Sequence, residues 1–265
     1  MNQLLTKITR SDKKAKRRQH IGQAIDIHQA EILEIGAFDH PTFTKGESNV
    51  YYCDYFSRSE LKANYGKSRP RRVENAVDVD YVVKNIDFAR SIDRKFDLII
   101  ANHVIEHIPN MIGWLQNLSL VLKQNGLLFL TIPHKDYTFD KLRSPTSIWE
   151  LIRNFDQNLQ APSLYQVADQ LYYHRPIKAH DIWQQKHQKL LNQRRFKNIK
   201  QAVKAAKDKI AQNGYVDTHC NVFTYKTFLR ILEELNQGAY ISLSVLSSSN
   251  VEQPDNEFYV LLANQ

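Results

Sequence analysis

Apolar residues recur along the chain in short runs that alternate with helical stretches. The runs predict strands at 31–36, 49–54, 76–83, 95–101 and 127–133. The third run alternates between polar and apolar residues, whereas the fourth is almost wholly apolar. Because parallel strands need crossover helices and bury both of their faces, this alternation predicts an α/β fold.

The pattern changes after the fifth run. The helix before that run is expected to stop at Asn125–Gly126, and residues from about 141 to 213 form aromatic-rich helical segments and one long helix rich in Gln, Lys and Arg. Alternation then resumes with strands at 239–248 and 257–265, joined by a turn. The preceding helix has one apolar face, formed by Phe228, Leu229, Leu232 and Leu235.

Together these elements predict a doubly wound, mostly parallel sheet of seven strands whose last strand is antiparallel, with an all-helical insertion. We divide the chain into a basic N-terminal arm (1–20), a core (21–140 and 214–265) and the insertion (141–213). The insertion is expected to be a substrate lid or a dimer element.

Charge adds two candidate contact regions. The net charge of +8 is concentrated in residues 1–19 and 178–213. Such segments are most often a mobile arm or a solvated face, but contact with nucleic acid or with an anionic membrane surface stays open. The apolar residues of the second segment are expected to dock on the core, a second subunit or an anionic surface, so the oligomeric state also stays open.

Cysteine usage and the polar N-terminus indicate the compartment. Cys53 and Cys220 give neither a disulfide framework nor a cysteine-rich zinc site. Residues 1–20 are polar and basic, and the longest apolar runs have the length of strands. These features predict a cytoplasmic protein.

The ends of the predicted strands carry the candidate ligand-binding residues, because ligands of a doubly wound sheet bind beyond the carboxyl ends of its strands. Glu34 ends the first strand and Gly36 lies in the turn after it. Asp54 ends the second strand, eighteen positions beyond Gly36, the spacing at which an acidic residue meets ribose hydroxyls. The alternative for Asp54 is a turn-capping aspartate.

The segment NHVIEH, Asn102 to His107, matches the H-x-x-E-H pattern of a zinc protease. That site needs a continuous helix, but a buried strand precedes the segment and Pro109 follows it. We therefore expect no metal ion, and we expect Glu106 and His107 to shape the turn into the next helix.

Several segments resemble class I S-adenosylmethionine-dependent methyltransferases. They are ILEIGAFDHP, YYCD and FDLIIANHVIEHIPNMIGWLQNLSLVLKQNGLLFLTIPHKDYTFD. VYYCD, WLQNLS, IPHKDYTFDKLR and DTHCNVFT are similar to an uncharacterised bacterial group of these enzymes linked to polysaccharide biosynthesis. The resemblance covers residues 30–140 and 215–265 and implies S-adenosylmethionine as the cofactor.

The resemblance implies a role for each strand end. Glu34 and Gly36 would lie near the methionine moiety, Asp54 would accept from both ribose hydroxyls, and Asn102 and His103 would lie below the sulfonium. In the family, a carboxylate after the third strand binds the adenine. Counting back from Phe96 by the usual interval places this position at Asn85–Ile86, and Asp78 and Asp80 are the alternative residues for this role. The family's loop glycines are replaced here by Phe38 and His40, whereas Asp39 tolerates a left-handed conformation.

Methyl transfer to a hydroxyl needs a positioned acceptor and a base, and histidine suits the base because its pKa lies near working pH. We expect His219 to be this base, and His134 is the second candidate. His107, Tyr137 and Arg143 are the candidate substrate-binding residues, although Tyr137 and Arg143 could equally anchor the insertion.

The predicted function is S-adenosylmethionine-dependent O-methylation of a sugar, glycolipid or other small molecule. An RNA methyltransferase is the alternative that the basic segments suggest, although the chain has no recognised RNA-binding module. A non-catalytic binding or scaffold protein is the alternative that the altered glycine loop suggests.

Overall fold

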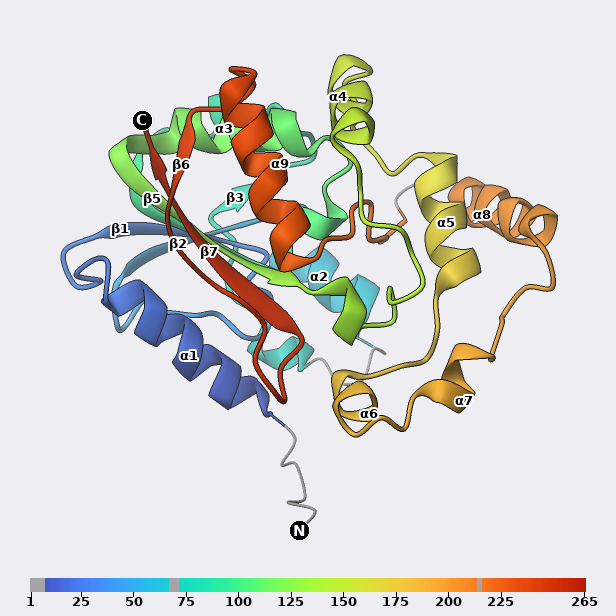
Figure 1. Ribbon diagram of the computed structural model, residues 1–265. Coiled ribbons are helices and arrows are strands. Elements are labelled where there is room, and N and C mark those ends of the chain that lie inside the picture. The colour runs from blue at the N-terminus through green and yellow to red at the C-terminus, as the bar shows by residue number, and fades with distance from the viewer. Residues whose placement is uncertain (1–7, 67–71, 214–215) are drawn as a thin grey trace, which may run out of the picture.

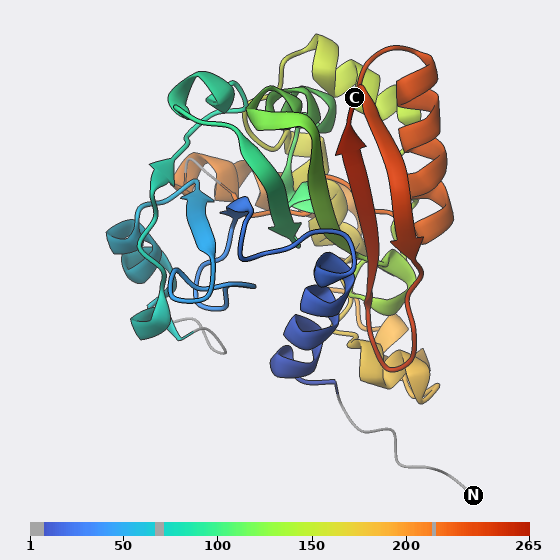
Figure 2. The ribbon, with the colours of Figure 1, turned by 90° about the vertical axis from the view of Figure 1, so that its left-hand side faces the viewer.

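The computed structural model describes residues 8–66, 72–213 and 216–265, and its centre is one seven-stranded sheet with the order β3-β2-β1-β4-β5-β7-β6 (Figures 1 and 2). β7 is antiparallel to both β5 and β6, and the other pairs are parallel. The strands are β1 (Glu31–Ile35), β2 (Asn49–Asp54), β3 (Tyr81–Val82), β4 (Phe96–Asn102), β5 (Leu122–Pro133), β6 (Leu243–Ser249) and β7 (Glu257–Asn264). The predicted α/β sheet with an antiparallel last strand is confirmed.

Helices cover both faces of the sheet, and the core therefore has two layers. The helices are α1 (Arg10–Gly22), α2 (Arg58–Tyr65), α3 (Met111–Val121), α4 (Ile148–Asp156), α5 (Leu164–Tyr173), α6 (Ala179–Trp183), α7 (Gln188–Leu191), α8 (Ile199–Asn213) and α9 (Tyr225–Gln237). Within β4, Ile99 packs in the cluster that contains α3 and α9, and Leu98 and Ile100 pack in the cluster that contains Ile21 of α1. Alternate side chains of a strand point to opposite faces, which explains this division.

Helix α1 corrects the expectation of a mobile basic arm for the residues from Arg10 onward. Thr9 caps the helix, with a reciprocal contact from Asp12, and Ile21 is fully buried against the sheet. Arg17 donates two hydrogen bonds to Glu257 at the start of β7, of 3.0 and 2.9 Å. The basic residues of α1 are thus partly used inside the chain, and residues 1–7 lie outside the described part.

The insertion is all-helical, as predicted. The prediction of one long basic helix is wrong, because the segment forms three separate helices, α6, α7 and α8. Gln185 adopts a left-handed φ of 57° just after α6, which ends that helix. The apolar side of α8, with Ala206 and Val203, packs against Val167 of α5. Part of the face that was expected to dock on the core or a partner is therefore covered within the insertion, whereas Ile199 of α8 is 63% exposed.

Two predicted boundaries differ for local reasons. β3 has only two residues. The N–H of Val77 donates to the carbonyl of Phe38, so the predicted strand does not pair with β2 at this residue. α3 ends at Val121 and β5 begins at once, although Asn125 does take the left-handed φ, at 60°. None of the helices in the described part of the chain has the length and apolarity needed to cross a membrane.

Candidate active site

The turn after β1 brings the first loop beside the end of β2. Gly36 has φ +70° and donates its N–H to the carbonyl of Cys53, next to Asp54, over 2.9 Å. A Cβ at Gly36 would lie 3.0 Å from Val104 Cγ2, so glycine is favoured by the left-handed conformation, and an added Cβ would crowd Val104.

Phe38 occupies the position where the family pattern would place a second glycine, and it keeps the left-handed conformation with φ 46°. Asp39, which would tolerate this geometry, is not among the residues with a positive φ. Asp39 is instead buried and pairs with Arg10 at 3.0 Å. The Phe38 ring is buried in an apolar cluster with Leu61 and Ala76. The loop thus keeps a left-handed turn without the glycine.

Glu34 fixes this loop from the β1 side. Its carboxylate accepts hydrogen bonds from the N–H of Thr42, the hydroxyl of Thr42 and the amide of Asn102. Asn102 also accepts from the hydroxyl of Thr131, so its amide braces β1, β4 and β5. Burial raises the pKa of Glu34 above its ordinary value, although the hydrogen bonds from Thr42 oppose the rise.

Asp54 lies at the carboxyl end of β2, and its Oδ1 accepts the N–H of Phe56 at 3.0 Å. The two candidates for the adenine contact differ in burial. Asn85 is exposed, whereas Ile86 is buried and its N–H donates a hydrogen bond to Oε1 of Gln160. Asp80 accepts from the N–H of Tyr52, in the middle of β2 rather than at its end.

His103 follows β4 with φ 54°, and its Nε2 lies 2.6 Å from Glu257 Oε2. Glu257 is 1% exposed and also contacts Lys13 and Arg17 of α1. Burial would raise the pKa of Glu257, but His103, Arg17 and Lys13 outweigh it and hold the pKa well below its ordinary range. We did not predict Glu257, although an acidic residue at the head of the apolar run FYVLL was a usable signal.

The chain after β4 forms a single 3-10 turn, Ile105–His107, followed by extended backbone at Ile108. The expectation that no long helix carries H-x-x-E-H is confirmed. Asn221 docks a distant segment on this turn: its N–H donates to the carbonyl of Glu106, and its side chain donates to the carbonyl of Ile108.

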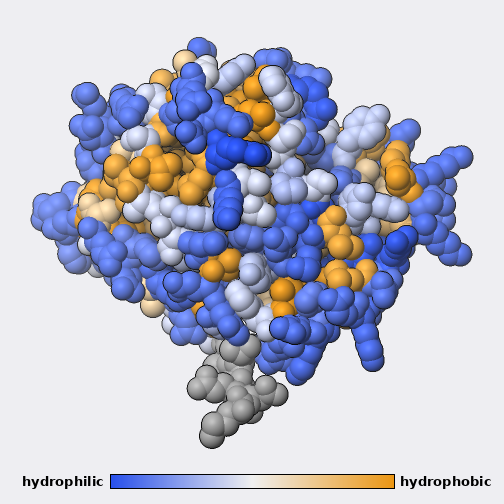
Figure 3. Space-filling model, in the orientation of Figure 1, coloured by the Kyte–Doolittle hydropathy of each residue, from blue (hydrophilic) through white to orange (hydrophobic). Residues whose placement is uncertain are grey.

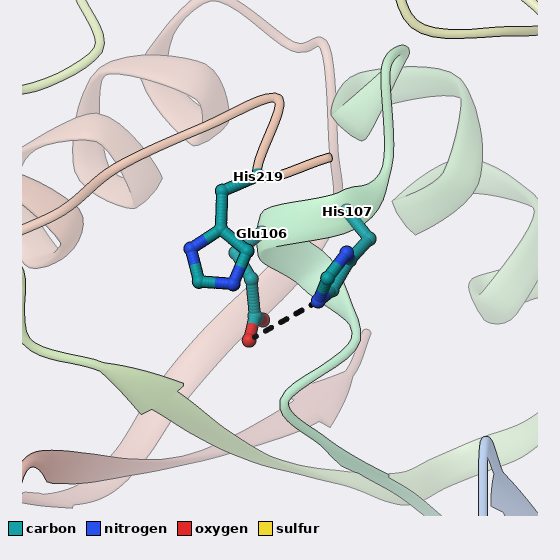
Figure 4. A group of neighbouring side chains, drawn as sticks. All are labelled: Glu106, His107 and His219. Atoms are coloured by element: carbon teal, nitrogen blue, oxygen red, sulfur yellow. Dashed lines mark ion pairs between the residues drawn. The ribbon is translucent and has the colours of Figure 1, made fainter. Parts of the chain in front are cut away.

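This docking places His219 beside Glu106 and His107 (Figure 4). The rings of His107 and His219 lie edge to face, with centroids 4.7 Å apart. Glu106 is 1% exposed, and His107 Nε2 lies 3.9 Å from its Oε1. Burial would raise the pKa of Glu106, but the neighbouring histidines lower it overall.

A series of charged side chains contacts His219 at its Nδ1 atom. Its Nδ1 lies 2.5 Å from Asp140 Oδ2, Asp140 Oδ1 accepts from Arg143 at 3.0 Å, and Arg143 donates to Asp169 of α5 at 2.6 Å. Arg143 is 4% exposed. These contacts favour its anchoring role over a direct role at a substrate entrance.

The other two candidates from the sequence lie together, apart from the Glu106, His107 and His219 group. The ring of His134 packs on Tyr137 and Phe258, and its Nδ1 accepts the N–H of Asp136 at 3.3 Å. Tyr137 also stacks on Trp183 of α6, with centroids 4.3 Å apart. Burial lowers the pKa of His134.

A cavity of about 640 Å³ lies within the insertion and reaches the segment that carries His219. Its lining includes Arg143, Tyr165, Asp169, Ala202 and Cys220. Small apolar patches lie among hydrophilic side chains on the right of Figure 3, where the insertion lies. The volume suits a small organic molecule.

Comparison with known proteins identifies relatives. Residues 10–237 match the family model described as "Methyltransferase domain". A ubiquinone biosynthesis O-methyltransferase of Rickettsia felis is 26% identical over 158 residues, 49% of this chain and 62% of that protein. The same enzyme of Rickettsia bellii is 23% identical over 154 residues, again 49% and 62%. The match thus spans less than two thirds of these relatives.

Solved structures of methyltransferases are among the matches. A putative S-adenosylmethionine-dependent methyltransferase from Listeria monocytogenes has a TM-score of 0.46 and 12% identity, covering 96% of this chain and 98% of that one. One from Clostridium acetobutylicum has a TM-score of 0.47 and 10% identity, with coverages of 97% and 92%. On the strength of the family model, which covers most of its residues, the chain belongs to the methyltransferase-domain family.

Proposed function

We propose that the chain transfers the methyl group of S-adenosylmethionine to a hydroxyl of a small molecule. The donor supplies a methyl group on a positively charged sulfur. The residues at the strand ends fit it: Gly36 keeps a tight turn beside Asp54, and Asp54 offers a carboxylate where ribose hydroxyls bind in this fold class. Phe38 preserves the left-handed turn, which supports retention of the loop's shape.

In this proposal, the residues implied by the resemblance hold the donor. Gly36 lets the backbone approach the methionine moiety, and Asp54 accepts from the ribose. Glu34 and Asn102 brace the loop through Thr42, and His103 is oriented by Glu257. Asn85 and Ile86 stay the proposed adenine contacts.

The His219–Asp140 pair is the main support for the proposal that the methyl group is transferred to an oxygen atom. Asp140 fixes the ring at 2.5 Å through Nδ1, which turns Nε2 toward Glu106 and His107 (Figure 4). A histidine oriented by a carboxylate can take the proton of a hydroxyl. His134 is the weaker candidate, because its Nδ1 already accepts a backbone N–H.

The acceptor class is a sugar, glycolipid or other small hydroxyl compound. The curated relatives bear the name O-methyltransferase, which supports oxygen as the methylated atom. The cavity of about 640 Å³ in the insertion supports a small-molecule acceptor, with the insertion as its lid. Arg143 lies in the cavity wall, His107 packs against His219, and Tyr137 stacks on Trp183 of α6.

A methyl-transfer assay with labelled S-adenosylmethionine tests this function. Acceptors would be sugars and glycolipids, phenolic compounds, and RNA in separate reactions. Label transfer to a hydroxyl compound that falls at least about 100-fold in His219→Ala supports the proposal. Transfer to RNA alone would contradict the small-molecule acceptor, and absence of transfer to every acceptor class together with absence of donor binding would favour a non-catalytic protein.

A further inference from the structure

Three metal-ligating side chains meet beside the turn that follows β4. Glu106 and His107 come from the turn itself, and His219 comes from the segment docked on it by Asn221. One potential ligand atom from each lies within 4.8 Å of the other two. Ligands about 2.0–2.2 Å from a tetrahedral ion lie about 3.3–3.6 Å apart, so small side-chain rotations complete such a site.

Each histidine has a carboxylate behind it. Asp140 lies 2.5 Å from His219 Nδ1, and Asp217 lies 2.7 Å from His107 Nδ1. The Asp217 contact has the distance of an ion pair but not the geometry of a hydrogen bond. In Figure 4 both Nε2 atoms turn toward Glu106. Metal-binding histidines are commonly oriented in this way by an acceptor on the other ring nitrogen.

The carboxylate of Glu106 lacks the hydrogen bonds that its burial demands. It is 1% exposed, and neither of its oxygens makes a hydrogen bond within the described part of the chain. His103 Nδ1 approaches Oε1 only to 3.4 Å. A buried ionised carboxylate without such bonds is costly, and a bound cation would remove that cost.

We propose that Glu106, His107 and His219 bind one divalent first-row transition-metal ion. Two imidazoles and one carboxylate suit Zn²⁺, Co²⁺, Mn²⁺ or Fe²⁺ better than Mg²⁺, which prefers oxygen ligands. Three protein ligands leave a position open for water or for a substrate oxygen. This is not the H-x-x-E-H protease site, because His103 pairs with Glu257 and the third ligand comes from a distant segment.

The site refines the proposed methyl transfer, and this consequence rests on that proposed function. A metal ion on His219 Nε2 excludes a proton there. The ion would bind the acceptor hydroxyl and lower its pKa, so that the hydroxyl loses its proton to solvent water and His219 serves as a metal ligand in place of a base. Metal binding itself is measured without donor or acceptor, so its failure leaves the methyl-transfer proposal intact.

The test uses the full chain, stripped with a chelator, desalted and titrated with CoCl2 and ZnCl2. We expect one Co²⁺ per chain with visible absorption of a four- or five-coordinate site, its displacement by Zn²⁺, and a higher melting temperature with either ion. Mg²⁺ should not compete. Glu106→Gln and His219→Ala should each weaken binding at least about 100-fold, and Asp217→Asn about 10-fold.

His28→Ala is the matched control, because His28 is exposed and lies outside the cluster. Metal-free Glu106→Gln should keep the cooperative melting transition of the metal-free wild type, because glutamine preserves the size and shape of the buried side chain. This result separates a lost ligand from a damaged fold. The proposal is overturned if the stripped wild type binds none of these ions in a one-to-one ratio, or if binding survives in both Glu106→Gln and His219→Ala.

Discussion

His103 Nε2 and Glu257 Oε2 lie 2.6 Å apart, which joins the turn after β4 to the first residue of β7. Glu257 extends this link to α1 through Lys13 and Arg17. Because β7 is antiparallel to β5, its first residue reaches the sheet edge where the parallel strands end. The last strand therefore contributes a buried charge to the candidate active site.

Glu257→Gln should lower the free energy of unfolding by about 3 kcal/mol at neutral pH, because it leaves Arg17 without its buried carboxylate and removes one of the two buried carboxylates that contact Lys13. Denaturant unfolding measures the change. Glu252→Gln is the control: Glu252 has 71% side-chain exposure and lies 3.8 Å from Lys16, so its loss should cost less than about 0.5 kcal/mol. Equal costs for the two variants would contradict the buried network.

The same carboxylate predicts an acid dependence of stability. The pKa of Glu257 is held below its unfolded value of 4.5, so its stabilisation is complete above that pH and is lost as pH falls through the folded pKa. Wild-type stability should therefore drop more steeply below about pH 4.5 than that of Glu257→Gln. Parallel stability curves for the two proteins below that pH would refute the assignment.

Gly36→Ala should destabilise the fold by about 1–2 kcal/mol, because alanine disfavours a left-handed backbone and its Cβ would press on Val104. It should also weaken S-adenosylmethionine binding. Gly46→Ala is the control, since a Cβ there meets nothing within 4 Å. Thermal unfolding and calorimetry check both effects, and a neutral Gly36→Ala would show that the turn does not require glycine.

Arg143→Ala should loosen the insertion, because Arg143 joins Asp140 to Asp169 of α5 while buried. Limited proteolysis should cut residues 141–213 faster in this variant than in the wild type. Arg153→Ala, at an exposed position of α4, serves as the comparison and should leave the cleavage rate unchanged. Unchanged cleavage in Arg143→Ala would return Arg143 to the role of a substrate contact.

The sequence predicted the sheet because its signal is local: buried strands are apolar runs, and a turn in place of a crossover helix marks the antiparallel end. It also placed Gly36 in the turn after the first strand and Asp54 at the end of the second, because these positions follow from local patterns. It did not reveal the group of Glu106, His107 and His219, because the docking of Asn221 on the 105–108 backbone joins segments more than a hundred residues apart. The fixed helix α1 was missed for the same reason, since Glu257 lies at the opposite end of the chain.

Calorimetric titration of the full chain with S-adenosylmethionine tests the central claim most directly. The account predicts saturable one-to-one binding by the wild type, weakened at least about 10-fold in Asp54→Ala, which removes the proposed ribose contact. Asp208→Ala, at an exposed position of α8, should bind like the wild type. Folded wild-type protein that binds no donor, or equal binding by the wild type and Asp54→Ala, would contradict the account.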